Sequence, residues 1–228
     1  MDLYSLTLLA LFAVLGLTVW AQYKVSHNFK EWSKVGIRSG MTGAETARLL
    51  LDKNGLQHIG VKAVPGMLTD HYDPVNKVIG LSEGVYGASS ISAVSIAAHE
   101  TGHAIQHKEQ YNMLVLRHRM TPVLKFTSGL APILIIAGIL FYSFNLIGIG
   151  VIFFATIVAF QLVTLPVEFN ASGRARQLLT TEGIISTSEG AGVKKVLDAA
   201  ALTYVAATLY AVVELFRYII IFLGMRRN

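Results

Sequence analysis

Two histidines and a glutamate near the middle of the chain have the types and the spacing that metal-assisted hydrolysis requires. Glu100 follows His99 directly, and His103 comes four residues after His99, which is the pattern H-E-x-x-H. Residues i and i+4 lie on the same face of a helix, so both imidazoles can direct a ring nitrogen at one zinc ion. Glu100 would lie about 100° further round the helix, within reach of a metal-bound water. The pattern predicts a zinc-dependent hydrolase with Glu100 as the general base, although two buried structural histidines would give the same spacing.

A catalytic zinc ion usually takes three protein ligands, so the two histidines need a partner. The chain has no cysteine, which restricts that partner to a histidine or a carboxylate. We select Glu168, because a glutamate from a later helix is the common partner of H-E-x-x-H, although it could instead stabilise the N-terminus of a helix that it begins. His107 continues the row from His103. Ligands from three successive turns would spread over about 12 Å, so we expect His107 beside the site.

The H-E-x-x-H segment must be helical to work, and its surroundings favour a helix. Residues 90–106 are rich in Ala, Ile and Val, contain no Pro and begin with serine. A second, amphipathic helix is predicted from Thr42, which forms a capping-box pattern with Glu45, to the stop at Asn54.

Residues 59–64 and 77–81 have β character and are separated by turn signals, so we expect a small sheet beside the zinc helix. An edge strand at residues 78–81 could hold an extended peptide by main-chain pairing. The same residues are equally consistent with the core of the sheet.

The composition indicates a membrane protein, because 53% of the residues are hydrophobic, 14% are charged and the mean hydropathy is +0.53. Residues 3–21 are long enough to span a bilayer and lack the basic start of a signal peptide, so we predict a retained anchor. Residues 122–144 and 146–167 are two further apolar runs separated only by Asn145, which predicts a helical hairpin. The chain after that hairpin would return to the side of His99.

Basic residues flank the predicted spans on one side, which predicts a cytoplasmic catalytic domain. These residues are Lys24, Lys30, Lys34, Arg117, Arg119, Lys125, Arg174 and Arg176. They also explain the net charge of +5 without a nucleic-acid partner. Residues 199–223 are apolar but contain Glu214 and Arg217, which can pair three residues apart, so whether this segment spans is left open.

With these residues identified, the chain resembles the YugP-type membrane zinc metallopeptidases of bacteria, also called neutral zinc metallopeptidases. Four segments carry the resemblance: residues 68–74 (LTDHYDP), 98–106 (AHETGHAIQ), 166–172 (PVEFNAS) and 200–206 (AALTYVA). The resemblance implies a multi-pass membrane metalloendopeptidase of the gluzincin type, with zinc on His99, His103 and Glu168. The chain is more distantly similar to the HtpX and CAAX prenyl protease group. That group has an aspartate where this chain has Ser172, so a carboxylate beside the ligands is not carried over.

The predicted fold is mainly α, a multi-span helical membrane protein with a zincin-like α+β catalytic domain and a small sheet beside the H-E-x-x-H helix. The expected parts are an anchor at residues 1–22, a zinc-binding catalytic domain at 23–121, a transmembrane hairpin at 122–167, a second catalytic part at 168–198 and a membrane-associated helix at 199–225. His71 is a candidate for an oxyanion or substrate contact, and an unspecialised loop histidine is an equal alternative. Tyr72 and Tyr204, from the segments that carry the resemblance, are further candidates for such contacts.

The predicted function is a zinc-dependent endopeptidase of the cell membrane that acts on peptides or membrane proteins. The expected partners are the substrate and the lipid bilayer, and an accessory protein or a second copy is left open. One alternative is a scaffold or chaperone with a structural zinc site, which would need a fourth ligand such as His107 or His71. Another is an ion transporter that uses Glu214 and Arg217.

Overall fold

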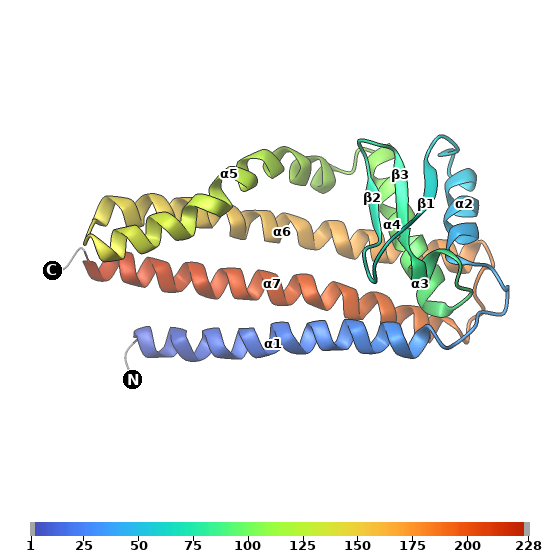
Figure 1. Cartoon of the computed structure of the whole chain (residues 1–228), viewed down its shortest axis with the longest axis horizontal. Coiled ribbons are helices and arrows are strands. Elements are labelled where there is room, and N and C mark those ends of the chain that lie inside the picture. The colour runs from blue at the N-terminus through green and yellow to red at the C-terminus, as the bar shows by residue number, and fades with distance from the viewer. Residues whose placement is uncertain (1–2, 226–228) are drawn as a thin grey trace. The chain divides into compact units, whose positions relative to one another are not determined.

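The computed structural model describes residues 3–225 and is mainly helical (Figure 1). Two compact units divide the chain. The first unit comprises the residues up to Ala21, Met113–Pro166 and the residues from Thr203 on, and the second comprises Gln22–Asn112 and Val167–Leu202. The part boundaries expected from the sequence stay a prediction. The four long helices described next contribute residues to both units, because each contains a boundary between them.

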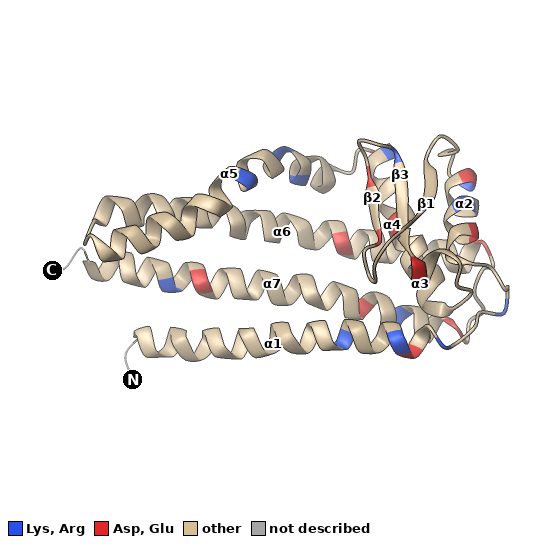
Figure 2. Ribbon diagram, in the orientation of Figure 1, with Lys and Arg blue, Asp and Glu red and all other residues tan. Residues whose placement is uncertain are grey.

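Within residues 3–225, four helices are long and apolar enough to cross a membrane: α1 (Leu3–Trp32), α5 (Asn112–Leu140), α6 (Phe144–Thr181) and α7 (Gly190–Met225). Figure 2 shows long stretches of α5, α6 and α7 without charged residues. In α7 the charged residues Glu214 and Arg217 form an ion pair of 2.5 Å, as predicted from their spacing. This pairing lowers the cost of placing both charges in an apolar helix.

Helices α5 and α6 pack against each other in antiparallel directions within the first unit. A Cβ atom added to Gly138 would lie 2.4 Å from a side-chain atom of Ile147, and one added to Gly150 would lie 2.6 Å from Ile135. The hydroxyl groups of Thr127 and Thr156 also join the two helices by a hydrogen bond of 2.7 Å. Small residues that let backbones approach, with a hydroxyl pair between them, are typical of helix packing in membranes.

The second unit contains a three-stranded sheet in the order β1 (Gly60–Val64), β3 (Val78–Ser82), β2 (His71–Asp73). Strand β1 is parallel to β3, and β2 is antiparallel to it. The sheet and two of its strands were predicted, but β2 was missed because three residues carry little periodic signal. The hypothesis that residues 78–81 form a peptide-binding edge is wrong, since β3 is paired on both sides and its residues from Ile79 on are buried.

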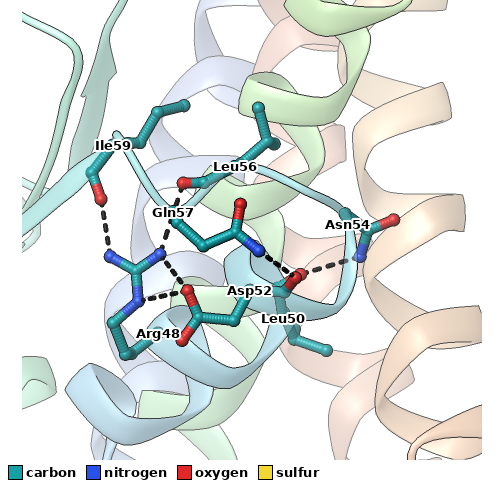
Figure 3. Close-up of polar contacts among 7 residues, drawn as sticks. All are labelled: Arg48, Leu50, Asp52, Asn54, Leu56, Gln57 and Ile59. Atoms are coloured by element: carbon teal, nitrogen blue, oxygen red, sulfur yellow. Dashed lines mark hydrogen bonds and ion pairs between the residues drawn. The ribbon is translucent and has the colours of Figure 1, made fainter.

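Helix α2 (Gly43–Lys53) begins with the predicted capping box. The backbone N–H of Glu45 donates to Thr42 Oγ1 at 3.2 Å, and the N–H of Thr42 donates to the Glu45 carboxylate at 2.7 Å. From the middle of the helix, Arg48 holds the loop that leads to β1 (Figure 3). Its guanidinium donates to the carbonyl oxygens of Ile59 and Leu56 at 2.6 and 3.3 Å and pairs with Asp52.

The helix with the H-E-x-x-H pattern is α4 (Ile91–Lys108), which follows the short helix α3 (Glu83–Tyr86). Ser90 caps it by accepting from the N–H of Ala93 at 3.2 Å. One face of α4 packs with the sheet through residues such as Ala97, and another packs with α6 and α7 through Ala98. This packing on two sides explains why α4 is apolar around most of its circumference.

Candidate metal centre

The structure brings His99, His103 and Glu168 together within the second unit. His99 Nε2 lies 3.3 Å from Glu168 Oε2, and His103 Nε2 lies 3.5 Å from the same oxygen. One ligand atom from each residue lies within 4.8 Å of the other two. The two imidazole rings meet edge to face, with centroids 4.7 Å apart. These three side chains therefore point at one small volume from α4 and α6.

The position of Glu168 in its helix differs from the expectation. The sequence suggested that Glu168 begins a helix at a membrane surface, but it lies in the interior of the continuous helix α6. Pro166 does not end this helix, because a proline removes only one backbone donor and long apolar helices tolerate that loss. Stabilisation of a helix N-terminus therefore cannot account for Glu168. The Glu168 side chain is only 3% exposed, so its charge needs a cation beside it.

A glycine lets α6 approach α4 at the level of the site. A Cβ atom added to Gly102 would lie 2.9 Å from the carbonyl oxygen of Ala171. On α4, Gly102 stands directly before His103, and Ala171 stands one turn after Glu168. Ala98 and Ala175, which also lie in the shared core, are fully buried. The small residues on both helices thus allow a glutamate side chain to reach the two imidazoles.

Gln106 fixes the ring of His103, and its role was missed in the sequence. The Gln106 amide nitrogen donates to the carbonyl oxygen of Val167 at 2.8 Å and to Asn170 Oδ1 at 2.9 Å. Both amide hydrogens are thereby used, so Oε1 must face His103 Nδ1, which lies 3.0 Å away and carries the proton. The lone pair of His103 is then on Nε2, which faces Glu168. A polar residue three positions after His103 in an apolar helix was the available signal.

Ser172 occupies the corresponding place behind His99. Its hydroxyl lies 3.2 Å from His99 Nδ1, so a neutral group stands where the more distant protease group has an aspartate. Asn170, which accepts from Gln106, also accepts from Arg174 Nε at 2.8 Å, and Arg174 pairs with Glu109 at 2.6 Å. Contacts of this kind hold metal-binding histidines in one orientation and one tautomer.

The electrostatics of the site favour a cation. Burial by itself would lower the pKa of His103, but the hydrogen bond and charge of Glu168 and the charge of Glu100 outweigh it and raise that pKa. Glu100 is buried, with 8% of the residue exposed, and belongs to the same turn of α4. Two imidazole nitrogens and one carboxylate oxygen form a set of donors that zinc accepts. The residues present therefore fit a zinc ion.

The other predicted site residues have contacts or positions of their own. His71, on β2, is exposed and donates from Nδ1 to the carbonyl oxygen of Thr69 at 2.8 Å. The hydroxyl of Tyr72 is 2.9 Å from His107 Nδ1, and burial raises the pKa of Tyr72, with help from the charge of Asp73. Neither His71 nor His107 belongs to the group of three among the residues the structure describes. Tyr204, on α7, belongs to the first unit.

Comparison with known proteins agrees with this arrangement. The family model described as "Putative neutral zinc metallopeptidase" matches residues 7–223. The chain belongs to this family of neutral zinc metallopeptidases. A Bacillus subtilis (strain 168) protein described as "Putative membrane protease YugP" is 58% identical over 214 residues, which cover 94% of this chain and 95% of that protein. No solved structure matches.

Zinc is accordingly the metal of this metallopeptidase, and His99, His103 and Glu168 form the site in the described structure that can hold it. The description of that relative names a membrane protease, and the part of the chain that the structure describes has four helices suited to a membrane. The chain is therefore a membrane protein of the neutral zinc metallopeptidase family.

The close approach of α4 and α6 leads to a first prediction. The substitution Gly102→Val places atoms where the Ala171 carbonyl now lies, so α6 must shift and carry Glu168 away from the histidines. We expect zinc affinity to fall by about tenfold or more, measured by competition with a chelator on the purified protein. Gly173→Val is the matched control, because a Cβ atom at Gly173 meets nothing within 4 Å. Native zinc affinity in Gly102→Val would contradict this account of the site.

The contacts of Gln106 lead to a second prediction. Gln106→Leu leaves His103 Nδ1 without its partner, so the ring is free to change tautomer and orientation. We expect about a tenfold to hundredfold loss of zinc affinity with little change in helix content, measured by chelator competition and circular dichroism. The control is Gln57→Leu, because Gln57 is exposed and donates only to the carbonyl of Asp52. Equal losses in both variants would argue against a specific role for Gln106.

Proposed function

We propose that this protein is a membrane-embedded zinc endopeptidase of the gluzincin type, with zinc held by His99, His103 and Glu168. The observation that carries the proposal is that two imidazole nitrogens and a carboxylate oxygen from two helices lie within 4.8 Å of one another. A structural zinc site is closed by four protein ligands, whereas the group found among the described residues has three. This count favours a site that keeps a position for water over the scaffold alternative.

The proposed mechanism assigns Glu100 as general base and acid. Bound zinc supplies Lewis acidity that activates water and polarises the peptide carbonyl. Glu100 takes the proton of the attacking water and passes it to the nitrogen of the leaving amine. Its burial beside the histidines places this carboxylate in a medium where charges act strongly. Gln106 keeps His103 in the tautomer that leaves Nε2 free for the metal, and the hydroxyl of Ser172 can accept from His99 Nδ1 when His99 has the same tautomer.

The proposal extends to the topology in the membrane. The four long apolar helices support a multi-pass protein, and the basic residues that flank them support a cytoplasmic catalytic unit. Peptide segments of membrane proteins, or peptides at the membrane surface, are then the expected substrates. The expected setting is the cell membrane, with the bilayer itself as a partner.

Substitution of the base separates catalysis from metal binding. Glu100→Gln keeps the size and polarity of the side chain but removes the proton acceptor, so we expect hydrolysis of a fluorogenic casein to fall by about a hundredfold or more. Zinc content, measured by mass spectrometry of the purified protein, should stay at the native level. His103→Ala should lose both casein hydrolysis and bound zinc. Glu83→Gln, an exposed glutamate on α3, is the control and should keep full activity. Native hydrolysis in Glu100→Gln would remove Glu100 as the base, and full zinc without hydrolysis in the native protein would favour the scaffold.

The topology can be tested with single cysteines, because the chain has none of its own. Val75, in the turn after β2, is 86% exposed, and Tyr142, between α5 and α6, is 87% exposed. We expect a membrane-impermeant maleimide to label Tyr142→Cys in intact cells and Val75→Cys only after lysis. The opposite pattern would place the catalytic unit outside the cell, and labelling of both in intact cells would contradict the proposed hairpin.

A further inference from the structure

A hollow of about 220 Å³ lies beside the C-terminal half of α4, within the second unit and outside the group of metal ligands. Its floor is apolar and consists of Leu56, Ile59 and Ala104, each of which is buried. Leu56 and Ile59 come from the loop between α2 and β1, and Ala104 comes from α4. A side chain of moderate size can therefore rest on apolar atoms here.

The rim of the hollow is basic. It is lined by Lys77 and Lys108, and by His58, Tyr72 and His107. None of the lining residues is acidic. Among residues 3–225, neither Lys77 nor Lys108 takes part in an ion pair; Lys108 Nζ donates to the carbonyl oxygen of Asn54 at 2.5 Å. Two lysines without a carboxylate partner give the hollow a positive potential that attracts an anion.

Several contacts hold the walls of the hollow in place before any ligand binds. Arg48 donates to the carbonyl oxygens of Leu56 and Ile59, which fixes the loop that forms the floor (Figure 3). The bond from Lys108 to Asn54 joins the same loop to α4. On the other side, the hydrogen bond between Tyr72 and His107 joins β2 to α4. A preformed site loses little conformational freedom on binding.

The hollow lies close to the proposed catalytic groups along α4. His107 follows His103 by four residues, which corresponds to about 6 Å along the axis. By the same geometry, His107 lies within about 20° of Glu100 around the helix, so the hollow is on the side of the base. A peptide held at Glu100 can therefore extend onto the hollow with the residues next to its scissile bond.

The C-terminus of α4 opposes anion binding, but weakly. The helix dipole places about half a negative charge at this end, against two full positive charges on the lysines. The last carbonyl oxygens are also already bonded. The N–H groups of Glu109, Gln110 and Tyr111 donate to Ile105, His107 and Gln106 at 2.9 to 3.1 Å. The positive charge of the rim therefore dominates.

We propose that this hollow binds a carboxylate of the peptide substrate, with the apolar part of the same residue on Leu56, Ile59 and Ala104. The inference rests on the proposed peptidase function and adds a substrate preference to it. The carboxylate comes either from the free C-terminus of the peptide or from an Asp or Glu side chain. Both sources present the same planar anion to Lys77, Lys108 and the pair formed by Tyr72 and His107.

The test measures binding, so that it does not depend on hydrolysis. Zinc-loaded Glu100→Gln protein of full length, in detergent, is titrated with three fluorescent peptides of one sequence, which end in leucine. The first ends in a carboxylate, the second in a carboxamide, and the third is the carboxamide with one internal glutamine replaced by glutamate. We expect at least one carboxylate form to bind about threefold to tenfold more tightly than the neutral carboxamide, as a partly exposed ion pair would give.

The advantage should disappear in Lys77→Met, which keeps the length of the side chain and removes its charge. Lys62→Met, an exposed lysine on β1 that does not line the hollow, is the matched control and should keep it. A preference for the terminal carboxylate identifies the C-terminus as the source, and a preference for the glutamate peptide identifies a side chain. Equal affinity for all three peptides, no binding by any of them, or an advantage that survives Lys77→Met overturns the proposal.

Failure of this proposal and failure of the peptidase function give different results. If native protein hydrolyses casein and Glu100→Gln does not, the peptidase function stands even when the peptides bind equally. If the carboxylate peptide binds through Lys77 but native protein hydrolyses nothing, the hollow is a carboxylate site on a protein without peptidase activity, and the substrate preference proposed here is overturned.

Discussion

The contact between the backbones of α4 and α6 at Gly102 and Ala171 is the constraint on which the candidate metal centre depends. A glutamate side chain reaches only a few ångströms from its helix, so Glu168 can meet His99 and His103 only if the two helices lie against each other there. Any side chain larger than hydrogen at Gly102 would fill that space. The absence of one Cβ atom on α4 therefore sets the distance between the ligands.

The burial that results from this approach also determines the electrostatics of the site. Burial of the Glu168 carboxylate, on a side chain that is 3% exposed, is costly unless a positive charge lies next to it. Protonated imidazole can supply that charge, and so can a zinc ion, which needs neutral imidazole instead. Gln106 and Ser172 bear on this choice because they bond to the Nδ1 atoms and leave the Nε2 atoms directed at Glu168. The polar groups behind the histidines thus prepare the site for a metal of the kind that this family uses.

The small sheet has a supporting role that differs from a simple peptide-binding edge. Its central strand β3 is hydrogen bonded to a neighbouring strand on both sides. The side chains of β3 contribute to the core that packs against α4. Strand β2 connects to α4 through Tyr72 and His107, and the loop before β1 is held by Arg48. These contacts hold in place the residues around the face of α4 next to Glu100. Lys77 and Lys108 give these surroundings a positive charge. Tyr72 and His107, which are not part of the metal centre, lie together on this face.

Local patterns determined much of this protein from the sequence alone. The four-residue spacing of His99 and His103, the capping box of α2, the pair of Glu214 and Arg217 and the long apolar runs each depend on neighbours within a few residues. Glu168 was found by chemical reasoning, since zinc needs a third ligand that cysteine could not provide. The residues that surround Glu168 in space could not be predicted from the sequence. The sequence also suggested that Glu168 begins a helix, whereas it lies in the interior of α6.

Tertiary structure decided the rest, because those features arise from contacts between distant parts of the chain. Gln106 meets Val167 across 61 positions and Ser172 meets His99 across 73, and no periodicity in the sequence records such pairs. The central position of β3 in the sheet could not be predicted either. It results from pairing with β2, a strand of three residues that is too short to show a pattern. The sequence by itself determined which side chains could carry the chemistry and which segments are helical or apolar. Only the packing of α4 against α6 decided that these side chains converge, since convergence depends on the distance between two backbones.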